Sequence, residues 1–128
     1  MSTTALELDQ LVERPPAAVW RALTEPDLLA AWWVPNDIAP TVGHRFHLDM
    51  GQWGKQPCEV LEVEPERRIL YSFGTYGWTL EWRLVPEGHA TRVLLTHAGF
   101  DLDDPMHKNA FDMMGPGWRD DVLPRLAA

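Results

Sequence analysis

Residues 78–85, with the sequence Trp-Thr-Leu-Glu-Trp-Arg-Leu-Val, decide the fold class of this chain. Every second position is apolar, from Trp78 to Leu84, and the positions between them are polar or charged. Strict alternation over the seven residues 78–84 is typical of a strand with one face against a core and the other toward water. The stretch therefore predicts a half-buried strand with two tryptophans on its inner face.

Five further segments on either side of this strand show strand-like patterns. The last one places Val93, Leu95 and His97 on one face, and Glu87-Gly88 turns the chain into it. The connection at 64–67, Glu-Pro-Glu-Arg, is short enough to join two strands as a hairpin. The five predicted strands cover residues 6–13, 45–50, 57–63, 68–73 and 91–98.

Helical patterns occupy two places in the chain. The Pro15-Pro16 pair opens a predicted helix over 17–23, and Thr24-Glu-Pro-Asp27 resembles a capping box before a second short helix to about Trp32. Near the C-terminus, Asp104-Pro105 is a typical helix start. Phe111, Met114, Trp118 and Val122 then recur at helical spacing, and Pro116 between two glycines is expected to kink or break that helix.

The order of these elements predicts the architecture. A strand, two short helices, about five consecutive strands and a long C-terminal helix form an α+β protein of the helix-grip type. Consecutive strands linked by hairpins make an antiparallel sheet, and its apolar face needs a cover. Only the C-terminal helix is long enough to provide it, so we expect a curved sheet of about six strands around that helix. A cavity can remain between the two.

Composition limits the classes of function. The 128 residues predict one domain over 1–128, and the net charge of −8 argues against nucleic acid and anionic membrane surfaces as partners. No segment reads as a signal peptide or a membrane span, which predicts a cytoplasmic protein. One cysteine excludes an intrachain disulfide. Seven tryptophans suggest either a pocket or a dense core.

Several stretches together resemble the START-like helix-grip superfamily (SRPBCC), and within it the branch named activator of Hsp90 ATPase homologue 1-like. The resemblance implies the predicted fold. Members of the superfamily bind lipids, hormones and polyketides, and some are cyclases or aromatases, so the fold alone does not select a function. This chain departs from the usual pattern at Gly115-Pro-Gly117 and at Pro124. The matching stretches are residues 16–26, 29–33, 43–46, 60–65, 70–72, 91–100 and 117–118, followed by Leu123 and Leu126.

Inward-facing aromatic and aliphatic residues are the candidate ligand site. They could line an apolar cavity of the kind that small-molecule sites favour, or they could meet and fill the core. Tyr71 and His97 are the candidates for orienting a ligand. The predicted ligand-binding residues are Phe46, Leu48, Met50, Tyr71, Phe73, Trp78, Trp82, His97, Phe111, Met114 and Trp118.

Few titratable side chains fit a catalytic or metal site. His97 either points into the cavity or is a structural histidine bonded to backbone near Gly99 or to the terminal helix. Glu59 is the best candidate for an interior acid, although exposure or a salt bridge is favoured. His44 and His47 fall on opposite faces of a strand, so we expect no metal site. Cys58 is expected to be buried and inert.

Three functions remain open. We favour binding of an apolar or aromatic small molecule, without cofactor or catalysis, between the sheet and the C-terminal helix. The first alternative is a cyclase or dehydratase that uses a cavity acid or base. The second is a protein-interaction module linked to chaperones, for which Trp32, Trp33 and Trp53 near loops could supply the contact surface. A homodimer through a sheet edge or these tryptophans is also considered.

Overall fold

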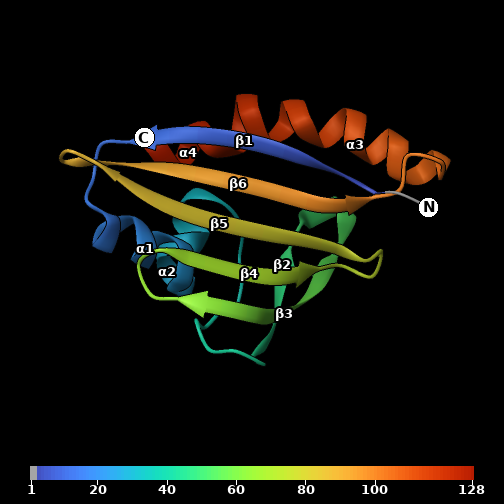
Figure 1. Cartoon of the computed structure of the whole chain (residues 1–128). Coiled ribbons are helices and arrows are strands. Elements are labelled where there is room, and N and C mark those ends of the chain that lie inside the picture. The colour runs from blue at the N-terminus through green and yellow to red at the C-terminus, as the bar shows by residue number, and fades with distance from the viewer. Residues whose placement is uncertain (1–2) are drawn as a thin grey trace.

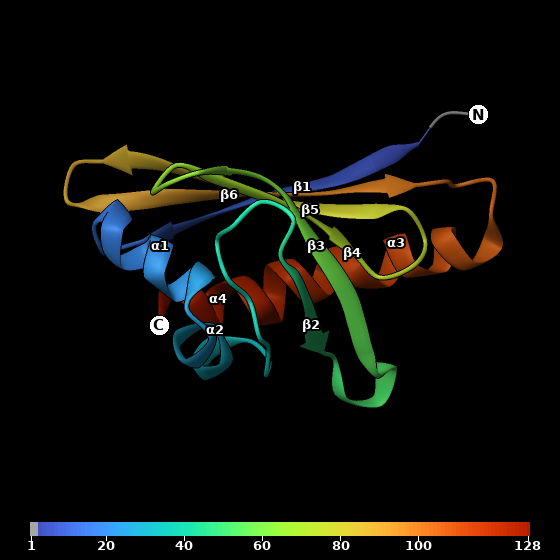
Figure 2. The ribbon, with the colours of Figure 1, turned by 90° about the horizontal axis from the view of Figure 1, so that it is seen from below.

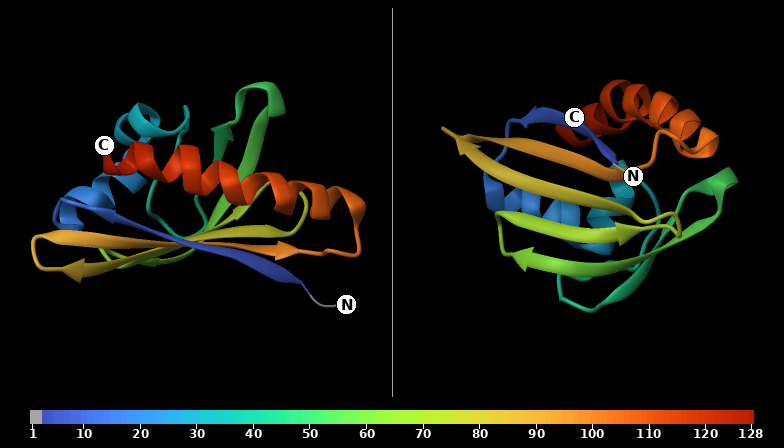
Figure 3. Two further views of the ribbon diagram at one scale, coloured as in Figure 1. Left: turned by 90° about the horizontal axis from the view of Figure 1, so that it is seen from above. Right: turned by 45° about the vertical axis from the view of Figure 1, so that its right-hand side comes forward.

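The computed structural model describes residues 3–128, which leaves the first two residues of the predicted domain outside the description. Six antiparallel strands form one sheet in the order β1-β6-β5-β4-β3-β2. The helices all lie on one side of this sheet (Figures 1 and 3). The strands are β1 (Thr4–Val12), β2 (Arg45–Asp49), β3 (Lys55–Glu64), β4 (Arg68–Phe73), β5 (Trp78–Glu87) and β6 (Ala90–Phe100). This confirms the predicted α+β helix-grip fold.

Cross-strand register brings the apolar positions into rows across the sheet. Tyr71 on β4 is opposite Leu80 on β5, and Leu80 is in turn opposite His97 on β6. The neighbouring row pairs Ile69 with Trp82 in the same way. Because side chains alternate between faces with period two, every member of these rows points to the same inner face. All five of these side chains are buried.

Two short helices, α1 (Pro16–Thr24) and α2 (Pro26–Trp32), follow β1 and pack at one end of the sheet. The predicted capping box between them is wrong. Glu25 is the N-cap of α2 and its side chain caps nothing, while the Thr24 hydroxyl donates to the Trp20 carbonyl one turn back, at 2.8 Å. Thr24 is buried, so its hydroxyl takes the partner available inside its own helix.

The C-terminal helix consists of α3 (Pro105–Gly117), a π-helical turn η2 (Trp118–Val122) and α4 (Leu123–Ala127). Its start is as predicted, with Asp104 accepting a hydrogen bond from the Met106 amide at 2.8 Å. A kink or a break was predicted at Pro116, and the break is wrong, because α3 includes that residue and continues to Gly117.

The irregularity instead follows Pro116, in the turn η2. There the Leu123 amide donates to the Trp118 carbonyl five residues back. Pro124 explains the position, since it has no amide hydrogen and its ring would crowd the carbonyl four residues earlier in an α-helix. A wider turn relieves this contact without ending the helix.

The β2–β3 hairpin rises on the same side of the sheet as α3 (Figures 2 and 3). A 3-10 turn, η1 (Gly51–Trp53), connects its strands. The inner face of the sheet is therefore covered by α1 and α2 at one end and by the C-terminal helix along its length, and it is flanked by this hairpin (Figure 3). The core lies in the space between these elements. No helix within residues 3–128 has the length and apolar character needed to cross a bilayer.

Gly99 on β6 is required by a close approach of the chain. It has φ +98°, and a Cβ atom there would lie 2.4 Å from the Gly77 carbonyl oxygen. Gly77 precedes β5 in the turn from β4, so this contact fixes where β5 begins beside β6. The following residue, Trp78, is thereby positioned on the inner face.

Candidate functional site

His97 lies on the inner face of the sheet, near the end of β6, and is fully buried. The Trp118 indole Nε1–H, from the turn η2, donates to its Nδ1 atom at 3.1 Å. Since Nδ1 accepts, it carries no proton, and a neutral imidazole must then carry its proton on Nε2. Burial lowers the pKa of His97 from 6.5 to about 3, which keeps the ring neutral.

The Nε2–H group of His97 has no hydrogen-bond partner among the described residues. Aromatic rings surround it instead. The ring centroids of Phe73, Trp78 and Phe100 lie 5.6, 5.4 and 4.6 Å from that of His97. Buried donors are paired in nearly all proteins, so this N–H group is an exception among the buried polar groups of residues 3–128.

Tyr71 is a second polar group on the same cross-strand row. Its hydroxyl oxygen accepts a hydrogen bond from the Trp82 Nε1–H at 2.8 Å, and both side chains are buried. Burial raises the pKa of the Tyr71 hydroxyl well above its usual value of 10, so the group keeps its proton. Tyr71 and His97 flank Leu80 and each binds one tryptophan indole.

Trp32, Trp33 and Trp118 cover these rows and pack with Trp82, which belongs to one of them. Trp82 and Trp118 meet edge to face with centroids 5.8 Å apart, and Trp33 contacts both rings at 5.9 and 5.2 Å. Trp32 stacks on Trp33 at 5.9 Å. These separations are those of direct ring contact, so the rings pack on one another here. The prediction that Trp32 and Trp33 could form a contact surface is not supported, because both pack against the core.

The predicted ligand residues fall into two groups by burial. The first group is buried on the inner face and in the C-terminal helix, and comprises Phe46, Leu48, Tyr71, Phe73, Trp78, Trp82, His97 and Trp118. The second group is half-buried and packs against that core from the ends of the hairpin and of α3. It comprises Met50, Phe111 and Met114.

Other candidate residues lie elsewhere. Glu59 is at the surface, where Arg45 forms an ion pair with it at 3.3 Å, so the favoured prediction of a salt bridge is confirmed. Cys58 is buried, and burial raises the pKa of its thiol to about 12. An inert thiol was predicted, and a group with this pKa is not a nucleophile at neutral pH. Trp53 is 65% exposed on the hairpin.

His107 is a buried histidine that the sequence analysis missed. Its Nδ1 atom accepts from the Asp101 amide at 3.0 Å and from the Trp78 indole at 3.4 Å. It joins the start of α3 to the end of β6 and to the inner face. Only its position in the first turn after Asp104-Pro105 hinted at such a role, because the residues it contacts are distant in sequence.

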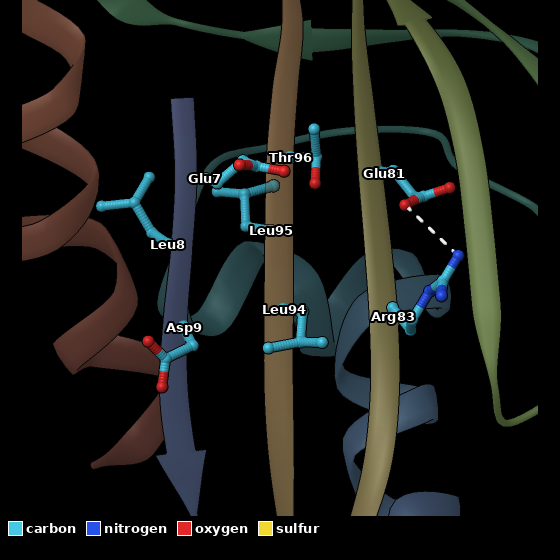
Figure 4. A pocket seen from close by; sticks show the side chains of 8 residues that line it. All are labelled: Glu7, Leu8, Asp9, Glu81, Arg83, Leu94, Leu95 and Thr96. Atoms are coloured by element: carbon cyan, nitrogen blue, oxygen red, sulfur yellow. Dashed lines mark ion pairs between the residues drawn. The ribbon is translucent and has the colours of Figure 1, made fainter. Parts of the chain in front are cut away.

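An open groove of about 440 Å³ lies against the sheet (Figure 4). Its polar lining comes from the outer positions of three strands, including Glu7, Asp9, Thr96 and an ion pair of Glu81 with Arg83 at 3.8 Å. Arg92 and Arg68 neutralise neighbouring carboxylates of the same face. Asp9 and Glu81 are thus paired with arginines, in contrast to the unpaired donor on the inner face.

A family model described as "Activator of Hsp90 ATPase homolog 1-like protein" matches residues 13–128 of the chain. Among curated proteins, none matches the sequence. Protein MLL2253 of Mesorhizobium loti has a similar structure, with 28% identity, a TM-score of 0.86, and coverage of 97% of this chain and 94% of the other. Protein BH1534 of Bacillus halodurans is 27% identical with a TM-score of 0.85, and the match covers 99% of this chain and 97% of the other.

A third similar structure is DynU16, described as a putative protein in the dynemicin biosynthetic locus. It is 26% identical with a TM-score of 0.80, and the match covers 96% of this chain but 45% of DynU16. The first two structures match this chain over almost their whole length, whereas DynU16 contains a similar unit within a longer protein.

Proposed function

Because this chain belongs to the activator of Hsp90 ATPase homolog 1-like family, we propose that it binds an apolar or aromatic small molecule. The ligand lies between the inner face of the sheet and the C-terminal helix. The observation that carries this proposal is the unpaired Nε2–H of His97, which is fully buried inside a shell of aromatic rings. Small-molecule sites combine such an apolar lining with a few polar groups that fix orientation.

A ligand enters between the β2–β3 hairpin and α3, where the covering side chains are only half-buried. Met50 at the end of β2, and Phe111 and Met114 on α3, are half-buried, whereas the side chains beneath them are buried. Methionine side chains have three rotatable bonds and repack at low cost, which suits a site that opens around its ligand. The hairpin and α3 therefore form the entrance in this proposal.

Binding is favoured over acid–base catalysis by the groups on the inner side. Apart from Tyr71 and the indoles, the buried polar side chains within residues 3–128 are Thr24, Thr91, His97 and His107, with no carboxylate among them. A general base works best with a pKa near the working pH, and the pKa of His97 is about 3. His97 is therefore suited to hold a ligand rather than to move its proton.

The proposal is tested with N-phenyl-1-naphthylamine, an uncharged aromatic probe whose fluorescence rises in apolar surroundings. We expect saturable binding with one site per chain. Leu80→Phe, which adds volume between Tyr71 and His97, should weaken binding about tenfold or more, since packed interiors accommodate added volume poorly. Leu94→Phe adds the same volume on the outer face and is the matched control.

Two results would refute the proposed binding between the sheet and the C-terminal helix, and a second pair of variants replaces the first if Leu80→Phe does not fold. Saturable binding that Leu80→Phe and Leu94→Phe change equally would place the probe outside the interior and contradict the proposal. Where Leu80→Phe fails to fold, as judged by its circular dichroism, Phe111→Ala replaces it. Removal of this half-buried ring at the entrance should accelerate probe entry, while Met113→Ala, at an exposed neighbour on α3, should leave entry unchanged. Absence of any saturable binding would also refute the proposal.

A further inference from the structure

We propose that the ligand is an uncharged aromatic carbonyl compound, such as a ketone or quinone, whose oxygen accepts a hydrogen bond from His97 Nε2–H. This inference rests on the proposed function and specifies the chemical class of the ligand. It follows from which atoms of the inner face can donate and which can accept.

Among residues 3–128, the inner face around His97 and Tyr71 offers donors and no free side-chain acceptor. The Trp118 indole occupies the Nδ1 lone pair of His97, so the remaining ring nitrogen can only donate. On the same row, the Tyr71 oxygen already accepts from Trp82, and its hydroxyl proton remains for donation. A ligand whose polar group is itself only a donor, such as an amide N–H, would gain no hydrogen bond at His97. An aryl amine such as N-phenyl-1-naphthylamine is held there by its rings alone.

Charged acceptors are disfavoured by the lack of a counterion. No lysine or arginine within residues 3–128 is buried; apart from Tyr71 and the indoles, the buried polar side chains are threonines and histidines. Transfer of a carboxylate from water to an apolar site without a paired cation is very costly. A single neutral N–H group does not compensate for that cost, so carboxylates such as fatty acids are excluded from this position.

An alcohol fits less well than a ketone for a related reason. Its oxygen can accept from Nε2–H, but its own proton is then placed among Phe73, Trp78 and Phe100, which offer no oxygen or carboxylate acceptor. A carbonyl oxygen accepts without adding a proton to be satisfied. The surrounding rings also favour a flat aromatic body, which can pack edge to face or offset against them.

The test compares fluorenone with fluorene, which has the same ring system without the carbonyl oxygen, and with fluorene-9-carboxylate. Each dissociation constant is measured by displacement of N-phenyl-1-naphthylamine from the wild-type protein and from His97→Phe. The ratio of the fluorene constant to the fluorenone constant should fall about tenfold in His97→Phe, because a hydrogen bond to a buried donor is lost. The carboxylate should not displace the probe.

A second measurement does not depend on a variant that folds. In the wild-type protein, the ¹⁵N-bound proton of His97 Nε2 should move downfield on addition of fluorenone and much less with fluorene. Equal affinities of fluorenone and fluorene, or a preference for fluorenone that His97→Phe retains, would overturn the inference while the proposed function stands. Displacement by the carboxylate would also overturn it. Failure of both ring compounds and of the probe to bind would instead refute the proposed function itself.

Discussion

Acid should destabilise this protein through His97, and the size of the effect follows from its burial. The pKa of His97 is 6.5 in ordinary surroundings and about 3 in the folded protein, because burial disfavours the charged ring. The folded state therefore keeps the neutral ring between these two values while the unfolded chain binds a proton. The free energy of unfolding is therefore unaffected by His97 above pH 6.5 and decreases as the pH falls from 6.5 to 3. Below pH 3 both states bind the proton, and His97 causes no further decrease.

The magnitude is about 1.4 kcal/mol per pH unit in that window, or about 2 kcal/mol between pH 7.5 and pH 5.0. Urea unfolding at both pH values, followed by tryptophan fluorescence, measures the free energy of unfolding. His97→Gln removes the titration and keeps a side chain that can accept from the Trp118 indole. The decrease in stability between the two pH values should therefore be about 2 kcal/mol smaller in His97→Gln than in the wild type.

His89→Gln is the matched control, because it removes a histidine that is exposed in the turn before β6 and leaves the buried His97 in place. Other groups that titrate between pH 5.0 and pH 7.5 contribute equally to the wild type and to both variants. If wild type and His97→Gln lose the same stability on acidification, the reasoning that burial keeps His97 neutral is refuted.

Three further outcomes are expected. Tyr71→Phe leaves the buried Trp82 indole N–H without its acceptor and should lower the free energy of urea unfolding by about 1–3 kcal/mol; an unchanged value would show that another acceptor replaces the hydroxyl. Gly99→Ala places a methyl group against the Gly77 carbonyl, so this variant should melt far below the wild type in calorimetry. Gly88 also has a positive φ but open space around it, so Gly88→Ala should lower the free energy of unfolding by only about 1–2 kcal/mol. Equal melting temperatures of the two variants would contradict the close approach at Gly99. Cys58 should not react with Ellman's reagent at pH 8 until urea unfolds the chain, since its pKa is raised to about 12, and rapid labelling of the folded protein would contradict its burial.

The strands of this fold could be predicted because each has one face in water. Alternation from Trp78 to Leu84 is visible in the sequence, and the register of an antiparallel sheet then places all inner positions on one side. Burial of the predicted strand residues such as Phe46 and Leu95 followed from the same pattern. The local sequence was sufficient for the strands because the alternation of apolar residues and the packing of the sheet place the same side chains on the inner face.

The C-terminal helix shows where local reasoning failed. A proline in a helix removes one hydrogen bond, and Pro116 was expected to interrupt it, yet α3 continues and the irregular turn follows at Trp118–Val122. Whether a helix tolerates a proline depends on packing along its whole length, since the buried Leu123 and Leu126 hold the segment beyond it. That contribution comes from contacts with distant strands and is absent from the local sequence.

The central bond of the site was also beyond the sequence. His97 was predicted to face inward, and bonding to the terminal helix was one of its two structural alternatives, which the Trp118 contact confirms. The donor could not be identified, because the direction of the indole depends on the turn η2. The unpaired Nε2–H follows only from knowing which nitrogen Trp118 occupies.

Titration of ¹⁵N-labelled protein with fluorenone, observed at the imidazole nitrogens of His97, tests the central claim most directly. The account predicts a free protein in which Nδ1 is unprotonated and Nε2 carries the proton, and a saturable shift of the His97 Nε2–H signal as the ligand binds. The exposed His89 should not respond. A His97 signal that stays constant while other resonances shift, or that shows a proton on Nδ1, would contradict the account.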